Sequence, residues 1–174
     1  MLPMIFTYLM LLVRLEEGIA PSDRYLPVRV VHFEGKPIIS ATLNGNPAHF
    51  LIDTGASVSI LNIRNRRELE FRTTPSSRHT GLYGLTGGSK PVEIALQTDL
   101  GIQDLTLPFQ WAATDLTELA RIIERRTDVE INGIIGSDLM HFYGFVIDYS
   151  TKTIWIANPA AESEDRAPMI TRRN

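Results

Sequence analysis

Cysteine is absent from the 174-residue chain. The chain therefore has no disulfide framework, no thiolate metal site and no cysteine nucleophile. The absence is compatible with either a reducing or an oxidising compartment, so it assigns no location. With 44% apolar residues, the chain is nevertheless long enough to bury the core of one domain without metals or cross-links.

An excess of positive charge is also missing, because the formal net charge is -3. The basic residues are scattered, apart from small clusters such as Arg125 and Arg126. Nucleic-acid binding needs a basic patch or stripe, so we expect no nucleic-acid partner. The histidines have no metal-ligand spacing, and we predict neither a metal site nor any other cofactor. They are His32, His49, His79 and His141.

Long apolar runs are scarce as well. The longest, residues 2–13, would span about 18 Å as a helix, whereas a bilayer core is about 30 Å thick. We interpret residues 1–24 as an apolar leader or anchor, and a docking helix, a signal and a shallow membrane anchor all remain open. Membrane association through residues 2–13 is possible on this reading, which leans toward a membrane-associated or secretory/periplasmic location.

What the chain does contain is a series of short apolar stretches separated by turn signals, at residues 28–33, 37–43, 48–52 and 92–96. This pattern is typical of an all-β domain. Asn44-Gly45-Asn46 separates two of these stretches and predicts a hairpin, because Asn and Gly tolerate positive φ. If these three residues form the connection between the two strands, Leu43 and His49 should lie near each other on adjacent strands.

Two segments depart from the β pattern. Residues 114–127 place Leu116, Leu119, Ala120 and Ile123 at helical spacing and predict a surface helix. Residues 137–142 predict a short helix capped by Ser137. The tail, residues 158–174, lacks periodicity, and we expect it to be disordered.

The chemistry is concentrated in Asp53-Thr54-Gly55-Ala56, directly after the apolar stretch that ends at Ile52. A carboxylate at the end of a buried strand is costly unless it is paired or hydrogen-bonded. One interpretation is a plain turn in which Asp53 accepts bonds from the next amides and Gly55 supplies conformational freedom. The alternative is an active-site loop, and the rest of the chain favours it.

Residues 28–157 resemble the single-lobed, retroviral-type (retropepsin-like) aspartic proteases, in which the active-site motif is Asp-Thr-Gly. Three further segments match that family in order. One corresponds to a glycine-rich flap, another to two aliphatic residues and a glycine before a short helix, and the last, residues 145–149 and 153–156, to the closing strands. The first is Gly84, Leu85, Thr86, Gly87 and Gly88, and the second is Ile134, Ile135 and Gly136.

The resemblance implies a closed retropepsin-like acid protease barrel over residues 25–157, with one surface helix inserted after the flap and one short C-terminal helix. It implies an aspartic endopeptidase in which Asp53 is catalytic and Thr54, Gly55 and Ala56 support the site. The flap and residues 134–136 would bind the peptide or protein substrate. Because the chain shows no second copy of the motif, the other carboxylate would come from the second chain of a symmetric homodimer.

This chain has Ser57 and Ser137 where retroviral members usually carry an acid and a basic residue that pair. Together with the helix at residues 114–127 and the paired glycines of the flap, this points to a cellular or bacterial branch. Two alternatives remain open: a catalytically silent dimerisation or peptide-binding module of the same fold, and a protease segment of a retroelement polyprotein.

Overall fold

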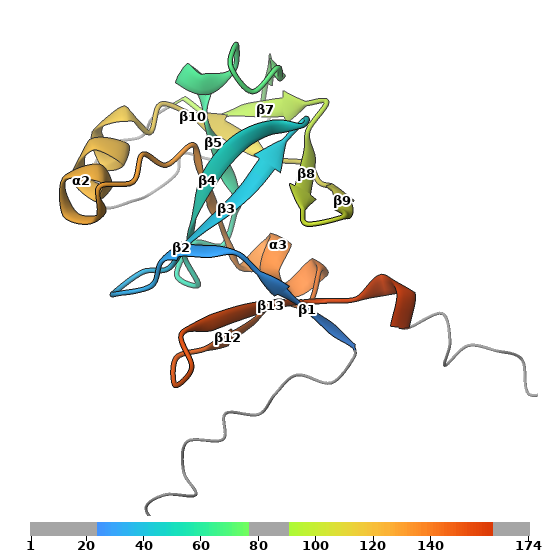
Figure 1. Ribbon diagram of the computed structural model, residues 1–174. Helices are drawn as coiled ribbons and strands as arrows, with labels where there is room; N and C mark the ends of the chain where they lie inside the picture. Colours follow the sequence, from blue (N-terminus) through green and yellow to red (C-terminus); the bar gives the residue numbers. More distant parts are fainter. Residues whose placement is uncertain (1–23, 77–90, 162–174) are drawn as a thin grey trace, which may run out of the picture. The chain divides into compact units, whose positions relative to one another are not determined.

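The computed structural model describes residues 24–76 and 91–161 (Figure 1). The chain divides into two units, one formed by residues 28–144 and the other by residues 1–27 with 145–174. Each unit has its own sheet, and the larger unit carries the segments that the sequence associates with a site.

The larger unit is built on a ten-stranded sheet with the order β6-β7-β10-β5-β11-β4-β3-β8-β9, and β2 pairs with β3 beside this path. Most neighbouring pairs are antiparallel, but β11 pairs in parallel with β4 and β10 in parallel with β5. The strands are β2 (Val30–His32), β3 (Ile38–Leu43), β4 (Asn46–Ile52), β5 (Ile60–Asn62), β6 (Arg72–Pro75), β7 (Glu93–Leu96), β8 (Asp99–Ile102), β9 (Leu105–Pro108), β10 (Ala112–Thr114) and β11 (Gly133–Ile135).

The helices of this unit are the short 3-10 helix η2 (Ile63–Asn65), α2 (Thr117–Thr127) and α3 (Ser137–Phe142). The apolar face of α2 packs on a cluster of buried residues that includes Leu51 of β4 and Ile60 of β5. Leu116 and Ala120 are members of this cluster. The helical spacing read from the sequence therefore identified the buried face of α2 correctly.

The smaller unit contains a three-stranded sheet with the order β1-β13-β12. Its strands are β1 (Tyr25–Val28), β12 (Val146–Asp148) and β13 (Thr153–Ala157). Asp148 lies at the end of β12, where its Oδ1 accepts hydrogen bonds from Ser150 and Thr151. These bonds, first of all the one from the Ser150 hydroxyl, lower the pKa of Asp148 to about 2.

The hairpin between β3 and β4 is tighter than the sequence suggested. Leu43 pairs with Asn46 and Ser40 with His49, so the expected proximity of Leu43 and His49 is wrong. The physical reason is that Asn44 and Gly45 alone form the turn, with φ values of 52° and 84°, and Asn46 already belongs to β4. Two residues of positive φ match the twist of the flanking strands.

The mostly β character of the chain and both helices in the larger unit are confirmed. The first helix begins at Thr117 rather than residue 114, because Thr114 still pairs with Asn62 at the end of β10. The expected cap of the second helix is wrong, since Gly136 occupies the N-cap and the Ser137 hydroxyl bonds to Ala56 instead. The closed barrel and the symmetric dimer stay predictions.

Several expectations concern residues outside the described ranges, namely most of the leader, the flap and residues 162–174 of the tail. Within residues 24–76 and 91–161, no helix is long and apolar enough to cross a membrane.

Candidate active site

Asp53 follows β4 directly, at the point where the strand leaves the core. Leu51 and Ile52 are buried, and they pair in parallel with Ile134 and Ile135 of β11. The Asp53 N–H continues this ladder by donating to the Ile135 carbonyl at 3.0 Å. The strand thus delivers the carboxylate to the edge of the core, where its side chain is 19% exposed.

The loop after β4 orients this carboxylate. The Gly55 N–H donates to Asp53 Oδ1 at 3.0 Å, and the Ala56 N–H donates to the Asp53 carbonyl at 3.0 Å. A Cβ at Gly55 would lie 3.3 Å from Oδ1, so a side chain at this position would crowd the carboxylate. Thr54 and Gly55 are both exposed, which leaves this surface accessible to another molecule.

Two of the segments singled out in the sequence meet at this loop. Gly136 follows β11 and packs against the loop backbone, since a Cβ there would come within 2.8 Å of the Ala56 and Val58 carbonyl oxygens. The Ser137 N–H also donates to the Ala56 carbonyl at 2.7 Å. The structure therefore brings residues 53–56 and residues 134–136 together.

Asp138 contributes a second link between these segments. Its Oδ1 accepts a hydrogen bond from the hydroxyl of Ser59 at 2.6 Å, and its Oδ2 accepts one from the Ser59 N–H at 3.0 Å. Ser59 is fully buried, and its hydroxyl in turn accepts the Gly136 N–H at 2.9 Å. The link between Asp138 and Ser59 could not be predicted from the sequence, because the two residues are far apart in the chain.

Lys36 is the residue of this site that the sequence analysis did not find. Its Nζ lies 2.6 Å from Asp53 Oδ2, on the opposite side of the carboxylate from the Gly55 contact to Oδ1. Lys36 precedes β3, whose pairing with β4 includes Ile38 opposite Leu51. If the turn had been predicted to consist of Asn44 and Gly45 alone, this contact could have been predicted as well. The strand pairing that follows from such a turn, continued along both strands, places residue 36 opposite residue 53.

The five flap residues, Gly84, Leu85, Thr86, Gly87 and Gly88, lie outside the described ranges. Their assignment as a flap therefore stays a prediction. Within the described ranges, no group of three or more His, Cys, Asp or Glu side chains is arranged to hold a metal ion.

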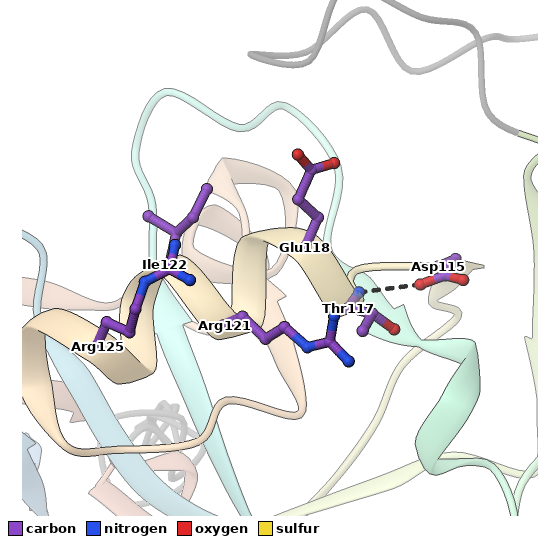
Figure 2. A pocket seen from close by; sticks show the side chains of 6 residues that line it. All are labelled: Asp115, Thr117, Glu118, Arg121, Ile122 and Arg125. Atoms are coloured by element: carbon purple, nitrogen blue, oxygen red, sulfur yellow. Dashed lines mark hydrogen bonds between the residues drawn. The ribbon is translucent and has the colours of Figure 1, made fainter.

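A separate polar hollow of about 550 Å³ lies along α2 and contains none of the site residues predicted from the sequence (Figure 2). It is lined by Asp115, Thr117, Glu118, Arg121, Ile122 and Arg125. Two acids and two arginines line it, so their formal charges compensate one another.

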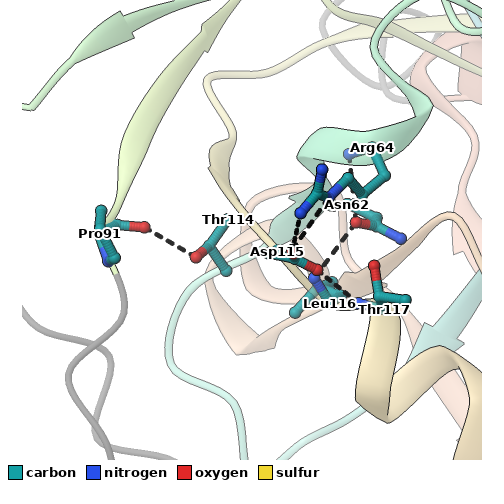
Figure 3. Close-up of polar contacts among 7 residues, drawn as sticks. All are labelled: Asn62, Arg64, Pro91, Thr114, Asp115, Leu116 and Thr117. Atoms are coloured by element: carbon teal, nitrogen blue, oxygen red, sulfur yellow. Dashed lines mark hydrogen bonds and ion pairs between the residues drawn. The ribbon is translucent and has the colours of Figure 1, made fainter.

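Figure 3 shows the network at the start of α2. Asp115 Oδ1 accepts the Thr117 N–H at 2.9 Å, and Oδ2 accepts two bonds from the Arg64 guanidinium at 2.9 and 2.7 Å. The hydrogen bonds from Thr117, joined by those from Arg64, hold the pKa of Asp115 well below its usual value. Asn62, which is buried, accepts the Leu116 N–H and fixes the chain just before the helix. These contacts indicate a structural role for this network.

The family model described as "Aspartyl protease" matches residues 39–139. No curated protein matches the chain significantly.

Solved structures similar to this one include two proteases and one protease-like domain. The retroviral protease-like domain of Ddi1 from Leishmania major is 20% identical with a TM-score of 0.46, over 70% of this chain and 87% of that one. A retropepsin-like aspartic protease from Rickettsia conorii is 18% identical with a TM-score of 0.49, over 76% and 89%. The EIAV protease complexed with the inhibitor HBY-793 is 21% identical with a TM-score of 0.44, over 64% and 90%.

Proposed function

The chain belongs to the aspartyl protease family, and from this premise we propose that it is an aspartic endopeptidase whose site is completed by a second copy of the chain. The observation that carries the proposal is the position of Asp53. It is a partly exposed carboxylate at the end of a core strand, and the Gly55 N–H orients it. It also lies within the residues that match the family model.

Hydrolysis of an amide needs a group that accepts a proton from water and a group that donates one toward the scissile carbonyl. Two adjacent carboxylates that share one proton fill both roles, because like charges so close cannot both ionise freely. The sequence contains one Asp-Thr-Gly motif. Asp138 is a poor candidate for the second acid, because its two oxygens accept bonds from Ser59.

We therefore assign the second carboxylate to Asp53 of another chain, related by a two-fold axis. Exposure of Thr54 and Gly55 supports a surface at which two such loops could meet. In this arrangement Thr54 would brace the paired loops, and residues 84–88 would contact a peptide in extended conformation. Ile134 and Ile135 are buried, so they would support the Asp53 strand from within the core instead of contacting the peptide.

The test is a peptide-library cleavage assay across pH with the parent chain and with Asp53→Asn. The amide is nearly isosteric with the carboxylate but cannot act as the proton acceptor, so we expect cleavage to vanish while the unfolding transition is retained. A library that the parent leaves uncut under all conditions would favour the catalytically silent peptide-binding module. Equal cleavage by both chains would exclude Asp53 as the catalytic acid.

A further inference from the structure

Lys36 is placed beside Asp53 by the register of the β3–β4 hairpin. The paired residues run from Leu43 opposite Asn46 to Ile38 opposite Leu51. Continuing by two residues on each strand places Lys36 opposite Asp53, on the same face as the last pair. The Ile52 N–H donates to the Pro37 carbonyl at 2.8 Å, so the backbone next to Lys36 is fixed to the backbone next to Asp53.

The resulting contact engages the carboxylate oxygen that the loop leaves open. Asp53 Oδ1 accepts the Gly55 N–H at 3.0 Å, and Oδ2 accepts the Lys36 ammonium at 2.6 Å. The Lys36 side chain remains 50% exposed. The contact is therefore short but open to solvent, and the ammonium can leave without crossing a packed core.

Such a contact opposes the chemistry proposed for the site. The Lys36 ammonium occupies Oδ2, an oxygen that a water molecule would otherwise approach. A working pair of carboxylates needs one proton between them, taken up from solvent, and an oxygen free to bind the attacking water. With a Lys36 on each Asp53, one oxygen of each carboxylate would be occupied by an ammonium instead of being open to the attacking water.

We infer that Lys36 is an internal inhibitory counter-ion of Asp53, which keeps the site at rest until the ammonium leaves Oδ2. This inference rests on the proposed function and adds to it a control on when the paired carboxylates can act. Because the Lys36 side chain is half exposed, dissolved salt weakens its attraction to Asp53: the screening length falls from about 10 Å at 0.1 M to about 3 Å at 1 M.

The test compares peptide cleavage by the parent, Lys36→Met, Lys36→Arg and Lys152→Met between about 0.05 and 1 M NaCl. All measurements use chain concentrations at which sedimentation shows equal dimer fractions. Lys36→Met keeps the length of the side chain and removes its charge, Lys36→Arg keeps the charge, and Lys152→Met removes the same charge from the turn between β12 and β13.

We expect parent activity to rise with salt by roughly two- to five-fold, the range that an exposed ion pair supports. Lys36→Met should begin at the raised value and stay flat, while Lys36→Arg and Lys152→Met should follow the parent. A Lys36→Met variant that folds normally but is no more active than the parent at low salt would overturn the inference. If Lys152→Met rose equally, a general charge effect would be responsible and the inference would fail.

A second measurement separates failure of this inference from failure of the proposed function. Acylation of Lys36 by an amine-reactive reagent should accelerate in Asp53→Asn, with Lys152 as the internal reference, because the charged partner is removed. An unchanged rate would show that the pair does not form, whatever the activity. If acylation of Lys36 is faster in Asp53→Asn but the parent shows no cleavage that depends on Asp53, the ion pair forms and the proposed function is refuted. The inhibitory role would then be refuted with it.

Discussion

The loop that carries Asp53 is fixed by residues that themselves have no reactive role. Gly136 lies against the Ala56 and Val58 carbonyls, and Asp138 bonds to the hydroxyl and the N–H of buried Ser59. Both residues belong to the segment after β11, and both act on the chain between residues 53 and 59. The position of the carboxylate therefore depends on close backbone packing as much as on its own hydrogen bonds.

Gly136→Ala tests this packing. The new Cβ would lie 2.8 Å from backbone atoms of Ala56 and Val58, so the loop must shift, and overpacking of this kind costs about 1–3 kcal/mol. We expect urea denaturation to show that loss in the free energy of unfolding, and cleavage activity to fall because Asp53 moves with the loop. Ser57→Ala, at an exposed position of the Asp53 loop, is the matched control. Unchanged stability in Gly136→Ala would mean that the loop yields without strain.

At the scale of elements, the start of α2 depends on charge. The helix has Leu116 as its N-cap, without a side-chain cap. Asp115 supplies the missing acceptor by bonding to the Thr117 N–H, and Arg64 links it to η2. An acid at this end also interacts favourably with the helix dipole. The helix thus begins where the β10 strand ends because Asp115 satisfies an amide that has no partner within the helix.

Asp115→Asn should lower stability in a pH-dependent way. The folded-state pKa of Asp115 is depressed, so its contribution is present above the unfolded value of about 3.9 and is lost as pH falls toward the folded value. Since the side chain is about one third exposed, the difference from the parent at pH 7 should be only about 0.5–1.5 kcal/mol. Urea denaturation at pH 7 and below pH 4 measures it, and the difference should shrink at the acidic end. A difference that grew there would contradict the assignment.

At the scale of the whole molecule, the proposal concerns the number of chains in a working site. The chain has one Asp-Thr-Gly motif, and the unit that carries it leaves Thr54 and Gly55 exposed. A symmetric dimer doubles whatever one chain contributes. Activity should therefore be proportional to the fraction of dimers in which both chains carry Asp53, and not to the total number of chains that carry it.

Mixing the parent with Asp53→Asn at equal amounts, under exchanging conditions, should reduce activity to about one quarter of an all-parent pool at the same total concentration. Random pairing leaves one quarter of the dimers with two carboxylates, and a mixed dimer lacks either the proton acceptor or the donor. The measurement is the rate of peptide cleavage, and chains that carry a mass tag verify that the subunits have exchanged. A fall to only one half would mean that each chain works alone.

The sequence by itself determined the family, the mostly β architecture and the buried face of α2. These features follow from patterns along the chain: apolar spacing sets which face is buried, and Asp53-Thr54-Gly55 becomes specific together with the other matching segments that follow it in order. Tertiary structure alone decided the bond from Ser59 to Asp138, the close approach of Gly136 to Ala56 and the contact of Lys36 with Asp53. Each of these contacts joins segments that are distant in the sequence. The contact of Lys36 with Asp53 also depends on the register of β3 and β4, because one residue more or fewer in the turn would change every pair along the two strands.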